Sequence, residues 1–587
     1  MKTFKKLFYL LNYRERITLV KLIFLMLVVA LLDMIGVASI MPFMAVLTNP
    51  GLIETNLILN SMFKISNIFG VENNQQFLFA LGFVVLALLI ISLFFKAITT
   101  YLQLRFVNMR EYSISKRLVE GYLRQPYSWF LNRNSADLGK TVLSELRTII
   151  GSGLRPMMDI IAKGTVTIAI IILLFLTNPK LTLIVGLSIG SAYLFIFYFL
   201  RNYLSRIGKE RLKKNELRFI ALSEAFGAAK EVKVGGLEKI YLERFSDPAK
   251  FYAHHQATSQ IIAQLPRFIL EVVAFSIVII AILYLMVQTG NFNNALPVIS
   301  LYVFAGYRLL PALQQMYACF TQLTFVGPSL DKLYNDLKSL KPNKRDQNQK
   351  NFSLNKKISL NNIYYNYPNS SRASLTDINL TIPANSTVGL VGPTGSGKTT
   401  TVDIILGLLE AQKGTLEVDG KIITHQNSIS WQKIIGYVPQ HIYLSDDSVL
   451  SNIAFGVNPS EIDHEGVKKV SKIANLHKFV MDELPSQYQT IIGERGVRLS
   501  GGQRQRIGIA RALYHNPKVI IFDEATSALD NETEKAVMEA VNNLDKDITI
   551  ILIAHRLNTL KNCDIIFKLE NGHLVNQGSF DKLINDK

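Results

Sequence analysis

The sequence predicts a multidomain membrane protein, in which an all-α domain of six transmembrane helices is followed by an α/β domain. Six long apolar stretches occupy the first 325 residues. The composition changes after about Leu337, and short β-branched runs then alternate with helical runs. A glycine-rich loop joins one strand-like run to the helical run that follows. The whole chain is 49% hydrophobic and 18% charged, which suits a membrane half joined to a water-soluble half.

Each apolar stretch has the roughly 20 residues that a helix needs to cross a bilayer. The start of the chain is basic, and its first apolar stretch is long and shows no small-residue cleavage site, which indicates a retained membrane helix rather than a signal peptide. The six stretches are 17–48, 77–104, 157–177, 181–204, 265–288 and 295–320.

Loop charge predicts the orientation of these helices. Residues 105–155 contain nine Lys or Arg and residues 201–218 contain seven, whereas the alternate loops are poor in both. Basic loops stay in the cytoplasm, so both termini and the α/β domain are expected there. This bias accounts for much of the net charge of +18, so no nucleic-acid partner is implied. The two cysteines indicate neither a disulfide framework nor a zinc site.

Shorter features of the sequence predict the cytoplasmic crossing segments, an outer helix and the domain boundaries. The two basic loops are rich in helix formers, and each contains a possible short crossing segment, near "QPYSWFLNRN" and "AFGAAKEVKVGG". The first outer loop, 49–74, has spaced apolar residues that suggest a short helix on the outer surface. A polar, proline-bearing stretch predicts a linker at 331–352, which leaves 1–330 as the membrane domain and 353–587 as the α/β domain.

The glycine-rich loop "GLVGPTGSGKTT" fits the phosphate-loop pattern, because glycines let backbone N–H groups turn toward phosphate oxygens. Lys398 is expected to reach the β- and γ-phosphates of a nucleotide, and the Thr399 hydroxyl to bind Mg²⁺. The candidate loop residues are Gly392, Pro393, Thr394, Gly395, Ser396, Gly397, Lys398, Thr399 and Thr400.

A second strand-like run, "KVIIFDEATSALD", ends in two carboxylates. We expect Asp523 to hold the Mg²⁺ shell and Glu524 to polarise an attacking water. The alternative is an acidic pair that caps the following helix. A phosphate loop upstream favours the catalytic interpretation.

These motifs, in this order, resemble those of ABC transporters of the exporter type, with fused membrane and ATPase domains. The resemblance implies that the α/β domain is a P-loop ABC ATPase using ATP and Mg²⁺. It implies that Tyr367 of "YYNYP" stacks on adenine and that Gln440 of "GYVPQ" reaches Mg²⁺. "GERG" (493–496) resembles the segment that touches the crossing helices. Asp530 of "SALD" joins the nucleotide site, and His555 of "IAHR" contacts the γ-phosphate and acts in catalysis with Glu524 and Lys398.

The stretch "LSGGQ" matches the family signature, and its glycines are expected at the start of a helix. In ABC proteins the signature caps the ATP that is held by a second ATPase domain. Ser500, Gly501, Gly502 and Gln503 are therefore expected to complete the site of another copy, which implies a homodimer.

Ionisable residues within membrane helices are costly and often functional. Arg308 and Asp33 are both deep, and one interpretation is that they pair with each other. Lys96, Lys163 and Arg267 lie nearer the cytoplasmic face, where they either snorkel or line a cavity, and Arg267 has Glu271 one turn away. The functional interpretation is that a basic cavity attracts an anionic head group such as a pyrophosphate. The candidate substrate residues are Arg308, Arg267, Lys163 and Lys96.

Residues 264–275 and 307–315 are similar to segments of bacterial flippases for lipid-linked oligosaccharides, and the long first outer loop also fits that group. This resemblance implies a flippase of the bacterial inner membrane that contacts membrane lipids and moves a polyprenyl-pyrophosphate glycan. An exporter of another lipid, a peptide or a drug stays open as an alternative. Two further alternatives are a soluble ABC machine, disfavoured by the six apolar stretches, and a nucleotide-gated channel, disfavoured by Glu524 and His555.

Overall fold

The computed structural model describes residues 2–68, 70–268, 271–273, 275–276, 279–280, 283, 292–340, 352–368, 370, 372–493, 496–524, 534, 547–554 and 560–585. The chain divides into two compact units. The helical unit consists of Met1–Gln125 and Arg133–Lys341, and the sheet unit consists of Pro126–Asn132 and Pro342–Lys587. The main division therefore falls within the segment that was expected to be a linker, 331–352.

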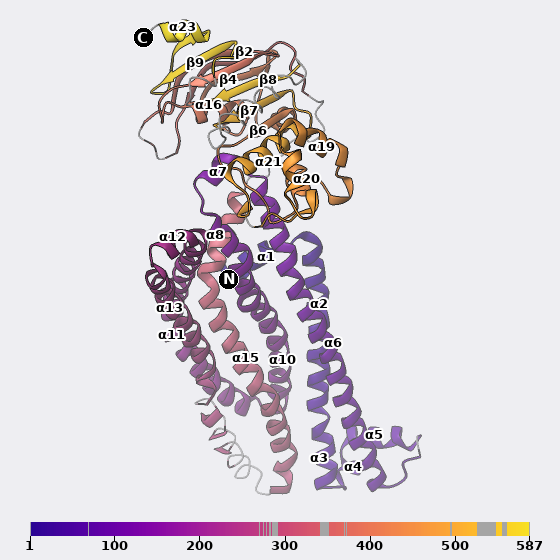
Figure 1. Ribbon diagram of the computed structural model, residues 1–587. Helices are drawn as coiled ribbons and strands as arrows, with labels where there is room; N and C mark the ends of the chain where they lie inside the picture. Colours follow the sequence, from indigo (N-terminus) through magenta and orange to yellow (C-terminus); the bar gives the residue numbers. More distant parts are fainter. Residues whose placement is uncertain are drawn as a thin grey trace. The chain divides into compact units, whose positions relative to one another are not determined.

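The helical unit is built from long helices joined by short ones (Figure 1). α10 packs against α15 and α2, α11 packs against α13 and α15, and α2 packs against α6. Its helices are α1 (Lys2–Tyr9), α2 (Tyr13–Ala38), α3 (Ile40–Thr48), α4 (Leu52–Thr55), α5 (Leu57–Asn67), α6 (Asn74–Leu123), α8 (Ser135–Lys140), α9 (Leu146–Ile149), α10 (Arg155–Thr177), α11 (Pro179–Gly227), α12 (Ala229–Val234), α13 (Glu238–Gln264) and α15 (Phe292–Ser339), with π-helical turns at Thr141–Glu145 and Ile150–Leu154.

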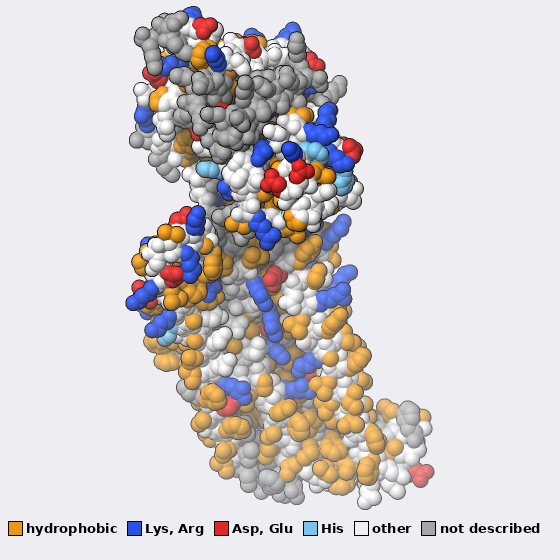
Figure 2. All heavy atoms as spheres, in the orientation of Figure 1, with side chains coloured by type: hydrophobic (Ala, Val, Ile, Leu, Met, Phe, Trp, Pro, Cys, Tyr) orange, Lys and Arg blue, Asp and Glu red, His pale blue; other side chains and the backbone are white. Residues whose placement is uncertain are grey.

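Five helical segments of the described residues are long and apolar enough to cross a membrane: Tyr13–Thr48, Asn74–Leu123, Ser135–Thr177, Pro179–Gly227 and Leu296–Ser339. They coincide with five of the six predicted apolar stretches, and half of the remaining one, 265–288, lies outside the described residues. The expected outer helix is present as α4 and α5, and short helices occupy both expected crossing segments. On the face shown in Figure 2, hydrophobic side chains dominate the part of the unit that carries α3, α4 and α5. Large apolar side chains such as Phe79, Phe83 and Leu194 are exposed, as expected for helices that face lipid.

The first nine residues of the expected linker, 331–339, are helical, because α15 runs without interruption to Ser339. Leu333 of this stretch is buried, so this end of α15 is packed.

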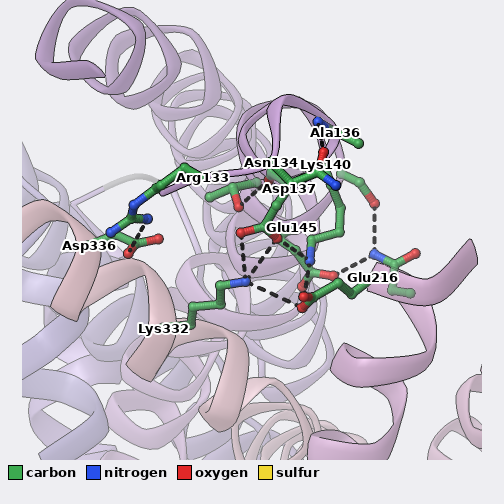
Figure 3. Close-up of polar contacts among 12 residues, drawn as sticks. Arg133, Asn134, Ala136, Asp137, Lys140, Glu145, Glu216, Lys332 and Asp336 are labelled. Atoms are coloured by element: carbon green, nitrogen blue, oxygen red, sulfur yellow. Dashed lines mark hydrogen bonds and ion pairs between the residues drawn. The ribbon is translucent and has the colours of Figure 1, made fainter. Parts of the chain in front are cut away.

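Ion pairs connect the helices of this unit (Figure 3). The ammonium of Lys140 is fully buried and lies 2.6 Å from Asp137 and 3.2 Å from Glu216. Lys332 of α15 reaches both carboxylates, at 2.9 and 3.5 Å. A second buried pair joins Arg211 of α11 to Glu145, at 2.8 Å. These contacts fasten α8, the first π-helical turn, α11 and α15 together.

The sheet unit contains two sheets. A four-stranded antiparallel sheet has the order β2-β1-β4-β5, and a six-stranded sheet has the order β10-β9-β3-β8-β7-β6. Within the second sheet, β9, β3, β8, β7 and β6 are parallel, which confirms the expected parallel sheet. The strands are β1 (Lys357–Tyr365), β2 (Leu375–Pro383), β3 (Thr387–Val391), β4 (Lys413–Val418), β5 (Lys421–Ile422), β6 (Ile435–Val438), β7 (Val519–Asp523), β8 (Thr549–Ile553), β9 (Ile565–Glu570) and β10 (His573–Gly578).

Both faces of the parallel sheet are buried, because successive residues of a strand point to opposite faces. Ile520 and Phe522 of β7 join one apolar cluster, and Val519 and Ile521 join the other. The helices of this unit are α7 (Tyr127–Leu131), α16 (Lys398–Ile405), α17 (Ser428–Gln432), α18 (Val449–Ile453), α19 (His464–Ile473), α20 (His477–Asp482), α21 (Gly501–Tyr514) and α23 (Phe580–Asn585), with 3₁₀ turns at Pro459–Glu461 and Gln487–Gln489.

Candidate functional site

The glycine-rich loop lies between β3 and α16, which is the strand–loop–helix context that the sequence predicted. Two of its glycines are required by close backbone approach. At Gly392 a Cβ would lie 2.0 Å from the Leu569 carbonyl oxygen, and at Gly397, with φ +102°, it would lie 2.9 Å from the Ser374 carbonyl oxygen. No larger residue fits either position, so the loop keeps its tight turn at the start of α16.

Lys398 is almost completely buried, and its ammonium donates to the carbonyl oxygens of Gly392 and Pro393 at 2.8 and 3.1 Å. Burial lowers the pKa of Lys398, whereas the charges of Glu524 and Asp523 raise it, so both carboxylates lie near the loop. Within the described part of the chain, the buried Ser396 hydroxyl has no hydrogen-bond partner. A buried ammonium and an unsatisfied hydroxyl fit the phosphate groups of a nucleotide.

The carboxylate pair lies at the end of β7. Asp523 is buried, and its Oδ2 accepts a hydrogen bond from the Tyr437 hydroxyl at 3.2 Å. Burial raises the pKa of Asp523, and the nearby charge of Glu524 raises it further. Glu524 has a left-handed backbone with φ +51°, which is strained for a residue other than glycine and is common at functional sites. Gln440 donates from Nε2 to Oε2 of Glu524 at 2.7 Å.

The structure therefore gathers four predicted residues around the loop: Lys398, Asp523, Glu524 and Gln440. Pro393, Thr394, Gly395 and Thr399 are exposed along the loop and the first turn of α16. Lys398, Thr399, Asp523 and Gln440 are suitable in chemistry to hold the phosphates and Mg²⁺ of bound ATP.

Tyr367 lies beside the same helix. Its hydroxyl is 3.3 Å from the Thr400 hydroxyl, and its ring contacts Tyr365 edge to face with centroids 5.1 Å apart. Stacking of Tyr367 on adenine stays a prediction.

The signature segment begins α21, which confirms that its glycines stand at a helix start. Ser500 is the N-cap. Its hydroxyl accepts from the Gln503 N–H at 3.2 Å, and the Gln503 side chain accepts from the Ser500 N–H at 2.8 Å. Ser500 is exposed, so this helix start is accessible. Its contact with a nucleotide on a second copy stays a prediction.

Three sequence predictions lie outside the described residues. These concern His555, Asp530 and the pair 494–495 within "GERG". The flanking Gly493 and Gly496 are described, and both have positive φ.

Sequence reasoning missed three residues near the site, which are Asp403, Tyr437 and Tyr127. Burial and the charge of Asp523 raise the pKa of Asp403, in α16, to about 6. Tyr437 bonds Asp523, and Tyr127 of α7 lies close enough to Asp403 for that carboxylate to raise its pKa, after the larger effect of burial. The signals were present, because Tyr437 belongs to "GYVPQ" and Tyr127 to "QPYSWFLNRN", but neither motif indicates which carboxylate its tyrosine meets.

The helical unit contains a cavity of about 380 Å³ between α2, α6, α10 and α15. Three of the four candidate substrate residues line it: Lys96, Lys163 and Arg308. Asp33 also lines it, and its carboxylate oxygens lie 3.9 Å from the nearest nitrogens of Arg308 and Lys96. The pairing of Asp33 with Arg308 that the sequence left open is therefore present as an ion pair, at a distance too long for a hydrogen bond. Arg267 does not line this cavity. It is largely exposed and pairs with Glu271 at 2.8 Å.

Comparison with known proteins bears on both units. The family description "ABC transporter transmembrane region" matches residues 22–307, and the description "ABC transporter" matches residues 375–527. The ATP-dependent lipid A-core flippase of Cupriavidus metallidurans is 30% identical over 477 residues, which cover 80% of this chain and 78% of that protein. The protein of the same name from Saccharophagus degradans is 29% identical over 481 residues, or 81% of this chain and 79% of that one.

Among solved structures, a bacterial Atm1-family ABC exporter with ATP bound has a TM-score of 0.78 and 22% identity, and the match covers 98% of this chain and 97% of that one. At this identity the likeness shows a common fold. Membrane region and ATPase are thus both matched in one polypeptide, in the order that the sequence predicted. The chain belongs to the ABC transporter family and couples ATP hydrolysis to transport across a membrane.

Proposed function

We propose that the chain is an ATP-driven flippase that moves a lipid-linked oligosaccharide, a glycan on a polyprenyl pyrophosphate, across a bacterial inner membrane. The observation that carries this proposal is the basic cavity within the membrane-crossing helices. Lys96, Lys163 and Arg308 line it together, and clustered cations at this depth suit an anionic head group. Curated relatives named lipid A-core flippases support a phosphorylated glycolipid as the class of cargo.

In the sheet unit we assign roles by position. ATP supplies the phosphoryl group and Mg²⁺ offsets its charge. Lys398 and the loop N–H groups bind the phosphates, and Asp523 and Gln440 hold the metal shell. Glu524 orients and polarises water, with His555 as the expected partner. These assignments rest on a general principle: fixed positive groups and N–H donors stabilise the negative charge that develops in the transition state.

We further propose that the working form is a homodimer. The phosphate loop and the signature are the two halves of an ABC nucleotide site, and Ser500 presents an exposed, capped helix start. Two copies packed head to tail would complete two sites. The N- and C-termini and the ATPase would then face the cytoplasm, as the basic loops indicate.

The alternative cargo is another lipid such as a lipid A-core, a peptide or a drug. Charge separates these classes, because a cavity whose charged lining carries a net charge of +2 should disfavour a ligand whose only charge is positive.

The test is transport in proteoliposomes of a labelled polyprenyl-pyrophosphate oligosaccharide, with and without ATP. We expect ATP-dependent translocation that Lys163→Gln reduces at least ten-fold. Lys180→Gln is the matched control, because Lys180 is exposed and does not line the cavity. Stimulation of the ATPase by a hydrophobic cation, with none by the anionic lipid, would exclude the proposed cargo.

A further inference from the structure

We propose that the cavity of the helical unit selects a head group that carries both an anionic phosphate and a protonated amine, and that Asp33 accepts the amine. This inference rests on the proposed function, since it concerns the same cavity and narrows the class of its ligand.

The lining of the cavity carries both signs of charge. Its volume of about 380 Å³ accommodates a phosphate with an attached sugar or amino-alkyl group. Four cationic side chains against two carboxylates leave a net charge of +2. The charged lining residues are Lys96, Arg155, Lys163, Arg308, Asp33 and Asp159.

Among the two carboxylates of the cavity, Asp33 is the one with a buried oxygen that accepts no hydrogen bond from the described residues. Its side chain is 1% exposed, and its Oδ1 accepts a hydrogen bond from the Ser92 hydroxyl. Its Oδ2 has no hydrogen-bond partner among the residues that the structure describes. The nearest cationic nitrogens, from Lys96 and Arg308, are both 3.9 Å from its oxygens, beyond the range of a hydrogen bond.

The second carboxylate differs in burial. Asp159 likewise accepts one hydrogen bond from α6, from Gln103 Nε2 at 2.6 Å, but the residue is only half-buried, and its second oxygen is not among the buried side-chain atoms that lack a partner in the described part of the chain. A buried carboxylate oxygen without a donor is unfavourable, and such a group in a cavity marks the place where a ligand supplies the donor. That place is Oδ2 of Asp33.

The charge pattern decides which donor fits. A phosphate placed between Lys96 and Arg308 would also lie close to the carboxylate of Asp33 and be repelled by it. A sugar hydroxyl could donate a hydrogen bond to Oδ2 of Asp33, but it is uncharged and would leave the repulsion between the phosphate and the carboxylate in place. A protonated amine on the same head group satisfies the oxygen and offsets the repulsion together, so an amine is the better match.

The test uses two lipids that differ in one charge: a polyprenyl phosphate bearing glucosamine, and the same lipid after N-acetylation. Binding to the detergent-purified full chain is measured for the wild type, Asp33→Asn and Asp159→Asn. We expect the wild type to bind the amine lipid about ten-fold more tightly. Asp33→Asn should abolish that preference, weakening the amine lipid and strengthening the acetylated one.

Asp159→Asn is the matched control, since it removes one cavity charge away from the proposed amine site and should strengthen both lipids alike. The inference is overturned if the wild type binds both lipids equally, or if Asp33→Asn shifts both by the same factor. The wild-type comparison needs no variant and stands even where Asp33→Asn does not fold. If neither lipid binds the wild type, the anionic cargo itself fails, and the proposed function falls with this inference.

Discussion

Removal of one partner of the ion pair between Arg211 and Glu145 should destabilise the helical unit. The two side chains are 0% and 4% exposed, with Nη2 and Oε2 2.8 Å apart. Glu145 also accepts from Asn215, and Arg211 donates to Ser329. Arg211→Met would remove the cation and leave a buried carboxylate with an amide donor. Loss of one partner of a buried pair costs about 3–5 kcal/mol, because the remaining charge is desolvated and uncompensated.

Thermal unfolding of the purified full chain measures this effect. Arg211→Met should lower the midpoint by on the order of 5–10 °C. Adding Glu145→Gln should recover more than half of the loss, because the second change removes the stranded charge. The control is Lys233→Met, whose partner Glu238 is half exposed, so no measurable shift is expected. Equal midpoints for Arg211→Met and Lys233→Met would refute the importance of the buried pair.

Three further changes address the sheet unit. Glu524→Gln should keep nucleotide binding and lower the ATPase rate at least ~100-fold, and hydrolysis at the wild-type rate would remove Glu524 from its role. Tyr437→Phe removes a hydrogen bond of about 1 kcal/mol to Asp523, so the KM for Mg·ATP should rise several-fold with kcat nearly unchanged. The pKa of Asp403 is raised to about 6, above the unfolded value of about 3.9, so the fold loses stability as pH rises from about 4 to 6. Asp403→Asn should therefore raise the free energy of unfolding at pH 7.5 by about 1–2 kcal/mol after discounting for solvent, and the gain should shrink as the pH falls and vanish below about pH 4.

Sequence reasoning succeeded where the signal is local. Five of the six apolar stretches appear within long helices of the described residues, because crossing length is a property of a single run of residues. α21 begins at the signature because Ser500 and Gln503 form a reciprocal cap three residues apart. The phosphate loop follows β3 as expected, since its glycines are fixed by close backbone contacts.

Sequence reasoning failed where the outcome depends on distant parts of the chain. α15 continues through 331–339, the first nine residues of the expected linker, and Leu333 within them is buried. The antiparallel sheet of β1, β2, β4 and β5 was not anticipated, since its pairing joins strands separated by the phosphate loop and α16. Arg267 resembled the other membrane cations in sequence, yet it lies away from the cavity, and only the packing of the helices separates them.

The residues missed by sequence reasoning include Tyr127, which belongs to the short helix α7, and Tyr437, which donates to Asp523. Residues 126–132 fold with the sheet unit, although the chain on both sides of them belongs to the helical unit. Tyr127 of this segment affects the pKa of Tyr437, whose hydroxyl bonds Asp523. Along the chain, α7 lies between α6 and α8. The chain therefore enters the sheet unit at residue 126 and leaves it at residue 132, long before the ATPase region begins, and coupled transport requires two states that both sites influence.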